Sequence, residues 1–487
     1  MKKIIINLFL LIIITIIVLI VILSTIGIET NKFNNFISNK TLKTKNFNLK
    51  LKTIKFKINP KELSLFLETQ NPKINYMDVS VPVQNIKVYI DFISLLKSDP
   101  KIKKTSLTLE ELDITQLNNI SSIMKPSNIK SLINNKIKKG KLISEIEIYL
   151  TEQGSLKNFI AKGSVKGLKA EIFEDLHFSQ SNFNFFADKN DILIKNIFGN
   201  LDDIKISDGD IKLNLENGIK ITSNFNSKIN FDARGFKKYR KLLKKYDFTN
   251  QIKFINADFV NNLSINLDQT YKVKDYNYNT SGTIKKGKFE LPKPINNLLI
   301  PEKIKEIYLS DLQVKMKLGT GRFEFNGDGK YSLNNLDFLK INFENNLTND
   351  QLDLKLDLDY KNIIELDIIN YKKNKNSVAN LSLNLNKNKN NFLVNNLSFI
   401  EGKNSIKING LKFKENKFVS LDKVEVETTN NDFFIKKGQK ILIKGNKFDA
   451  TNLTKYFNNQ NDENNFKNFN TEIEIDFKDI KVPMSEK

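Results

Sequence analysis

Apolar and polar residues alternate along most of this chain. In residues 352–360, leucine or tyrosine occupies every even position, and aspartate or lysine occupies every odd position. Successive side chains of a β-strand point to opposite faces of the sheet, so this alternation predicts strands with one apolar and one polar face. The same pattern recurs at residues 47–51, 107–109, 146–150, 211–215, 219–221, 323–325, 381–385, 406–408, 424–426 and 473–477.

Short segments rich in Gly, Asn and Asp separate these runs. We interpret six of them as turns: residues 163–167, 207–209, 216–218, 319–321, 326–329 and 444–446. Short connections favour antiparallel neighbours, because parallel strands need crossovers of a dozen residues or more. Helical crossover sequences are missing from most of residues 140–487, which argues against a doubly wound α/β fold or a TIM barrel.

The N-terminus has a different pattern. Lys2 and Lys3 precede an almost entirely apolar run, residues 4–28. A helix of that length reaches about 37 Å, enough to cross a hydrocarbon core with some tilt. The alternative is a cleaved signal peptide, but the run is too long for one and lacks a small-residue cleavage site. We expect an uncleaved single-pass anchor, with its N-terminus in the cytoplasm and the rest of the chain beyond the membrane.

A few segments have helical spacing instead. Residues 92–98 predict a short helix before Pro100, and residues 115–138 are mixed. The sharpest pattern is in residues 235–248, where the apolar side chains share one side. Three interpretations remain: a helix that covers the sheet, a helix that lies on an anionic membrane surface, or a helix that binds another polyanion. The basic side that would face the membrane consists of Lys237, Lys238, Arg240, Lys241, Lys244 and Lys245.

Composition narrows the possible functions. The formal net charge is +22, but an AT-rich genome would by itself enrich a chain in Asn, Lys and Ile. The charge therefore indicates solubility or attraction to anionic headgroups, and without a nucleic-acid-binding motif we expect no nucleic-acid partner. The chain has no Cys and a single His, His177, which excludes disulfides and Cys or His-cluster zinc sites. We expect no catalytic residues, no cofactor and no metal site, and hence a protein that is not an enzyme.

One block resembles a known family. Residues 83–117 read as a strand, a Ser-Leu-Leu-Lys helical turn, a proline and a second alternating strand. This resembles the N-terminal part of the AsmA-like family, which includes TamB-type and YhdP-type bacterial envelope proteins. Residues 198–215 and 438–453 are similar to strand–turn–strand steps of the same family. The resemblance implies a protein that bridges the inner and outer membranes and passes phospholipid along an apolar groove, with no catalytic residues.

The predicted fold class is mainly β: one N-terminal transmembrane helix, followed by an elongated, curled antiparallel sheet that forms an open groove with a few short helices. We expect a cytoplasmic tip and anchor at residues 1–29, an N-terminal α+β module at residues 30–139, and a repetitive β-groove at residues 140–487. The last strand would leave an unprotected sheet edge, so we also expect the polypeptide to continue beyond residue 487.

An apolar sheet face must be hidden, either against a second sheet or by curling into a trough that holds acyl chains. We expect a trough. The expected partners are phospholipid acyl chains and the inner membrane, with outer-membrane proteins as a further candidate, and the expected function is phospholipid transport between the two membranes and envelope integrity. The alternative is a non-transporting anchored β-sandwich scaffold or stalk. The groove candidates are Leu352, Leu354, Leu356, Leu358, Leu381, Leu383 and Leu385.

Overall fold

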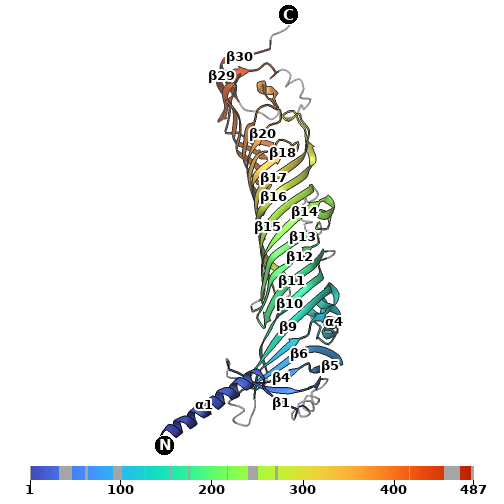
Figure 1. The fold of residues 1–487 in the computed structure, drawn as a ribbon. Coiled ribbons are helices and arrows are strands. Elements are labelled where there is room, and N and C mark those ends of the chain that lie inside the picture. The colour runs from blue at the N-terminus through green and yellow to red at the C-terminus, as the bar shows by residue number, and fades with distance from the viewer. Residues whose placement is uncertain are drawn as a thin grey trace. The chain divides into compact units, whose positions relative to one another are not determined.

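The structure, a computed structural model, consists mainly of β-strands (Figure 1). Strand accounts for 69% of it and helix for 11%. Within the described residues, the sheet is long and mostly antiparallel and does not close into a barrel. The predicted mainly-β fold with one N-terminal apolar helix is therefore confirmed. The structure describes residues 2–31, 34, 47–60, 64–91, 101–126, 128–153, 155–173, 176–216, 218–239, 251–268, 272–415, 417–453 and 472–483.

The apolar N-terminal run forms α1 (Lys2–Thr25), which is long and apolar enough to cross a membrane. The chain leaves the helix at Gly27, whose φ of +75° is a conformation that favours glycine. It then enters β1 (Ile28–Thr30) at once, and β1 pairs antiparallel with β3 (Ile54–Asn59). No flexible linker therefore separates the apolar helix from the first strand of the sheet.

The chain folds into two compact units. The first is Met1–Asn226 with Ile265–Lys274, and the second is Ser227–Ser264 with Asp275–Lys487. The predicted boundaries after residues 29 and 139 stay predictions.

The first unit is built from successive antiparallel strand pairs. β9 pairs with both β7 and β10, and β10 to β13 then pair in chain order. A small apolar core of Ile74, Val83 and Ile86 lies where β5 and β6 pair. The elements are β2 (Phe47–Lys50), β4 (Ser64–Gln70), β5 (Lys73–Tyr76), β6 (Val79–Ile90), β7 (Ile102–Leu109), β8 (Leu112–Asp113), α4 (Ile114–Ser122), α5 (Asn128–Ser131), η1 (Leu132–Lys136), β9 (Ile137–Leu150), β10 (Leu156–Phe173), β11 (Leu176–Asp188), β12 (Asp191–Leu201) and β13 (Ile204–Asn214).

Two of the helical predictions fall in this unit. The helical spacing in residues 115–138 is confirmed by α4 and α5. α4 begins with a capping box, in which Asp113 and Gln116 each bond the other's backbone amide. The short helix predicted for residues 92–98 lies outside the described residues.

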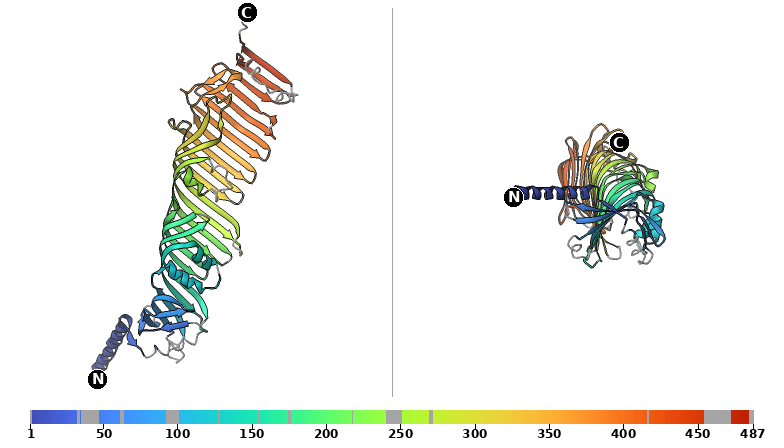
Figure 2. Two further views of the ribbon diagram at one scale, coloured as in Figure 1. Left: turned by 90° about the vertical axis from the view of Figure 1, so that its right-hand side faces the viewer. Right: turned by 60° about the horizontal axis from the view of Figure 1, so that its bottom comes forward.

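The second unit continues the antiparallel pattern. Figure 2 shows its strands, in yellow to red, side by side in chain order. β30 instead joins β29 in parallel, which a connection of more than 20 residues permits. The elements are β14 (Ile219–Asp232), α6 (Ala233–Lys237), β15 (Ile252–Leu267), β16 (Val273–Ile295), β17 (Ile304–Gly319), β18 (Arg322–Ser332), β19 (Leu339–Thr348), β20 (Gln351–Tyr360), β21 (Ile364–Leu366), η3 (Asp367–Ile369), β22 (Tyr371–Lys373), β23 (Ala379–Asn388), β24 (Asn391–Glu401), β25 (Asn404–Lys414), β26 (Lys417–Ser420), β27 (Lys423–Glu427), β28 (Asp432–Lys437), β29 (Ile441–Asp449) and β30 (Ile473–Lys481); β14, β15 and β16 also include residues of the first unit.

Several predicted turns are interior parts of long strands. The turn interpretation is wrong for residues 163–167, 207–209, 326–329 and 444–446, which lie in β10, β13, β18 and β29. Residues 216–218 and 319–321 do connect consecutive strands. The reason is visible at Gly327, which lies directly opposite Phe343. There the glycine leaves room for an aromatic ring on the neighbouring strand rather than for a reversal of the chain.

Candidate functional site

The apolar side chains of the second unit form continuous rows across its strands. Because the strands pair in register, a row places an apolar residue of one strand opposite an apolar residue of the next. We call the surface formed by two such rows the apolar face. One row is Phe343, Leu356, Leu383, Leu397, Ile408, Val424 and Ile435, and the other is Ile341, Leu358, Leu381, Phe399, Ile406, Val426 and Phe433.

The structure brings the predicted groove leucines together on the apolar side of β20 and β23. Leu352 lies opposite Lys387, at the end of this strand pair. Leu385 is buried, and the other six leucines are half-buried. Half burial fits a side chain that packs against neighbours in its own sheet and keeps part of its surface open. The remaining pairs are Leu354 with Leu385, Leu356 with Leu383, and Leu358 with Leu381.

The other side of the same strands is polar and hydrogen-bonded. The Asp357 carboxylate accepts hydrogen bonds from Ser382 and from Asn380. Lys355 forms an ion pair of 2.9 Å with Glu344, and both side chains are more than half exposed. Asp357 therefore belongs to a cross-strand network, whereas the Lys355 pair is a surface contact of small energetic value.

One end of the apolar face is covered by residues 361–378, which we call the cover hairpin. It connects β20 to β23 and contains β21, η3 and β22, with β21 and β22 paired antiparallel. Ile369 and Tyr371 of the hairpin pack into a core with sheet residues Ala379, Phe399, Ile406, Val426 and Phe433. The apolar face is thus closed at this end, a feature that the alternating pattern did not predict.

A buried lysine holds the cover hairpin together. Lys373 has no exposed surface. Its ammonium donates to the carbonyl oxygens of Lys361 (2.8 Å), Asn362 (3.2 Å), Asn374 (2.9 Å) and Ser377 (2.7 Å). Burial lowers the pKa of Lys373. No sequence signal could have found this residue, because it stands in a lysine-rich, loop-like segment.

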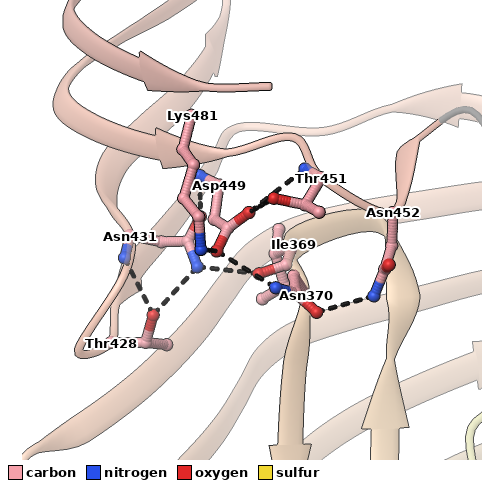
Figure 3. Close-up of polar contacts among 8 residues, drawn as sticks. All are labelled: Ile369, Asn370, Thr428, Asn431, Asp449, Thr451, Asn452 and Lys481. Atoms are coloured by element: carbon pink, nitrogen blue, oxygen red, sulfur yellow. Dashed lines mark hydrogen bonds and ion pairs between the residues drawn. The ribbon is translucent and has the colours of Figure 1, made fainter. Parts of the chain in front are cut away.

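A network of polar contacts connects the tip of the cover hairpin to the last strands, and we call it the polar clasp (Figure 3). Its members are Ile369, Asn370, Thr428, Asn431, Asp449, Thr451, Asn452 and Lys481. Asn431 donates to the carbonyl oxygen of Ile369 (2.8 Å), and Asn370 donates to Asp449 (3.1 Å). Asn452 in turn donates to Asn370 (2.6 Å). Asn431 and Asp449 are each only 1% exposed, so these bonds form in a water-poor environment, where losing a partner is costly.

A second buried polar network interrupts the apolar side of β14 to β16. Asn261, only 1% exposed, donates to Ser227 (2.9 Å) and accepts from Tyr278 (2.7 Å) and Thr280 (2.9 Å). Thr280 lies opposite Met316, on the side of the sheet that bears the apolar residues. The sequence does contain a signal for this buried asparagine. Asn261 takes a position that is apolar in the rest of the alternation, at Ile255, Ala257 and Phe259.

The predicted basic helix is described only at its start. Phe236 of α6 is buried, and so is Tyr239, which follows the helix. The Tyr239 ring stacks on Phe231 at a centroid distance of 5.0 Å. Lys237 and Lys238 are exposed. The described part therefore covers the sheet with its apolar side. The other candidates, Arg240, Lys241, Lys244 and Lys245, lie outside the described residues.

Within the described ranges, no group of three or more His, Asp or Glu side chains is placed to hold a metal ion. The candidate site is the apolar face. Among the described residues, the cover hairpin packs on one end of this face, and the row through Leu356 is half-buried. No family model, curated protein or solved structure matches this chain.

Proposed function

We propose that the apolar face binds the acyl chains of phospholipids, and that the protein is a non-enzymatic, AsmA-like envelope protein that helps phospholipid pass between the inner and outer membranes. The observation that carries the proposal is the half burial of Phe343, Leu356, Leu383 and Leu397, which lie in one row beyond the cover hairpin's core. An acyl chain along that row would gain about 0.8 kcal/mol for each CH₂ group removed from water.

The proposal includes an inner-membrane anchor. α1 would span the membrane once, with Lys2 and Lys3 in the cytoplasm and the two units in the periplasm. The positive charges that precede the helix favour this orientation. The immediate pairing of β1 with β3 would hold the first strands close to the membrane surface, where phospholipid is available.

A second candidate function is a non-transporting envelope scaffold or stalk. The observation in its favour is the core under the cover hairpin, where Phe399, Ile406 and Val426 are buried as in an ordinary closed domain. If the whole apolar face were closed in this way by a partner, the face would stabilise the protein and would have no access to lipid.

Two matched double variants of the full chain separate these functions. Leu356→Asp with Leu383→Asp places two carboxylates opposite each other on the apolar face. The control variant is Lys355→Asp with Asn384→Asp. It also places two carboxylates opposite each other, but on the polar face of the same two strands. The readouts are thermal unfolding and crosslinking to a phospholipid with a diazirine in its acyl chain, with the crosslinked residues mapped by mass spectrometry.

The lipid-binding proposal predicts crosslinks on the row through Leu356 in the wild type and in the polar-face variant. It predicts their loss in the apolar-face variant, which should still fold because its carboxylates remain accessible to water. A closed scaffold predicts no crosslinks on this row and unfolding of the apolar-face variant, since a buried unpaired carboxylate costs several kcal/mol. Crosslinks confined to α1 would therefore contradict the proposal.

A further inference from the structure

Two neighbouring turns of the second unit expose large apolar side chains. One joins β16 to β17 and the other joins β18 to β19. Leu298 is 69% exposed, Leu299 50% and Leu336 83%, the last being an unusually high value for leucine. We call this patch the leucine lip; its members are Ile295, Leu298, Leu299, Leu336 and Phe338.

Local hydrogen bonds fix both turns in the conformation that exposes the leucines. The Asn297 side chain accepts from the amides of Leu299 (3.0 Å) and Ile300 (2.9 Å). The Asn334 side chain accepts from the amides of Leu336 and Asp337, both at 2.9 Å. Asparagine stabilises turns in this way. The exposure therefore belongs to ordered turns, whose shape is set by bonds close by in the sequence.

The two turns meet beside the cover hairpin. The amide of Glu365, in β21, donates to the carbonyl oxygen of Leu299 (3.1 Å), and Lys361 pairs with Asp337 (2.6 Å). Lys303, Asn334, Asp337 and Lys361 also line one shared hollow of about 590 Å³. The two turns that carry the leucine lip thus lie close together at the same end of their strands, beside the cover hairpin.

The surroundings of the lip are basic. Lys293, Lys303 and Lys305 flank the first turn and are exposed, and they form no ion pair in the described part of the chain. Nearby acidic groups are already paired: Glu302 with Lys375, and Asp337 with Lys361. The leucine lip therefore has apolar side chains at its centre and lysines around them. This arrangement fits the boundary between the acyl chains and the anionic headgroups of a bilayer.

We infer that the leucine lip inserts into the headgroup layer of an anionic phospholipid bilayer, as a membrane contact separate from α1. The free lysines favour this occupant over a second copy of the chain, which carries a net charge of +22 and would repel another lysine-ringed patch. The inference does not require the apolar face to bind acyl chains, because the lip and the face use different residues.

The chain has no tryptophan, so a single introduced one reports on its own position. Leu336→Trp places the probe on the lip. Asp350→Trp places it at the opposite end of β19, in the turn to β20, as a matched control. The full chain is held by α1 in nanodiscs, and vesicles of brominated phosphatidylcholine with about 30% phosphatidylglycerol, an anionic lipid, are added. In a second arm, the brominated lipid is in the nanodisc and not in the vesicles.

The expected result is a blue shift and quenching of the lip probe in at least one arm, with the control probe in the β19–β20 turn unchanged in both. The arm that quenches tells whether the lip contacts the membrane that holds α1 or another one. Adding Leu298→Asp to the Leu336→Trp variant should reduce the blue shift and the quenching in whichever arm shows them, because a carboxylate on the lip opposes its insertion. Equal behaviour of the two probes would overturn the inference. So would a blue shift of the lip probe that depends on protein concentration and not on lipid, because the lip would then join two copies of the chain.

Discussion

Phe343 lies directly opposite Gly327 in the β18–β19 pair, and its ring occupies the space that a side chain at position 327 would need. A Cβ atom at Gly327 would stand 2.5 Å from both Cε1 and Cζ of Phe343. The same relationship recurs in the first unit, where Gly163 lies opposite Phe185. A glycine opposite a phenylalanine is therefore a repeated way for this sheet to make room for an aromatic ring.

Replacing Gly327 by valine should destabilise the second unit. The valine side chain would displace the Phe343 ring from its place on the apolar face, which should cost about 1–3 kcal/mol. Chemical denaturation of the full chain measures the change. Gly438→Ala is the control, because a Cβ there approaches no neighbour closer than 3.9 Å, and it should leave the midpoint unchanged. A Gly327→Val variant as stable as the control would show that the ring does not need this glycine.

The sequence predicted the faces of the strands better than it predicted where the chain turns. Alternation alone places Leu356 and Leu383 on one side and Lys355 on the other, because side chains change face at every residue. The turn interpretation is wrong for Gly327, because a single sequence does not reveal the phenylalanine on the strand beside it. Strand register is a non-local property, and so is the role of a glycine that depends on it.

The cover hairpin was missed for a related reason. Its sequence is mixed and lysine-rich and has no clear period, so nothing in it indicates a segment that packs onto an apolar face. The burial of Lys373 depends on four carbonyl oxygens that the folded loop brings together. A side chain that is held by such a set of backbone carbonyl oxygens can be identified only once the path of the backbone is known.

The anchor can be tested because the chain contains no cysteine. We expect a single cysteine at Asp350→Cys to react with a membrane-impermeant maleimide once the outer membrane is permeabilised, because the second unit would lie in the periplasm. A cysteine at Lys3→Cys should react only after the inner membrane is also broken. The opposite labelling pattern would mean that α1 is inserted the other way round, and a mature chain that starts near residue 26 would mean that α1 is cleaved.

Replacing Lys373 by methionine should loosen the cover hairpin. Methionine nearly keeps the length of the side chain and removes the buried ammonium that donates to four carbonyl oxygens, which should cost about 2–3 kcal/mol. Lys372→Met is the matched control, since the Lys372 side chain is 56% exposed and pairs with Glu365 at the surface. Hydrogen exchange at residues 364–373 should become faster in the first variant alone. Unchanged exchange would mean that the apolar core holds the hairpin without the lysine.

The Asp449 carboxylate should make the polar clasp sensitive to acid. Burial of Asp449 opposes its ionisation, but hydrogen bonds from Thr451 and Asn370 and the contact with Lys481 outweigh it, and the pKa of Asp449 falls to about 2 from its usual 3.8. A carboxyl group whose pKa is lower in the folded state stabilises that state above its unfolded pKa, and the stabilisation is lost as the pH falls. The window of this loss runs from about pH 4 to about pH 2.

Asp449→Asn isolates this contribution. The variant should be less stable than the wild type at pH 7, by about 1–3 kcal/mol, because the amide cannot replace the charge that Lys481 and Asn370 contact. The difference in stability between the two proteins should shrink as the pH falls from 4 to 2. Over this range the wild type loses the stabilisation from the ionised carboxylate, which the variant lacks at every pH. Thermal unfolding at pH 7, 4 and 2.5 measures it, with Asp479→Asn on the exposed face of β30 as the control. A difference that stays constant over this range would mean that Asp449 acts through its shape and hydrogen bonds, and that its charge contributes nothing to the clasp.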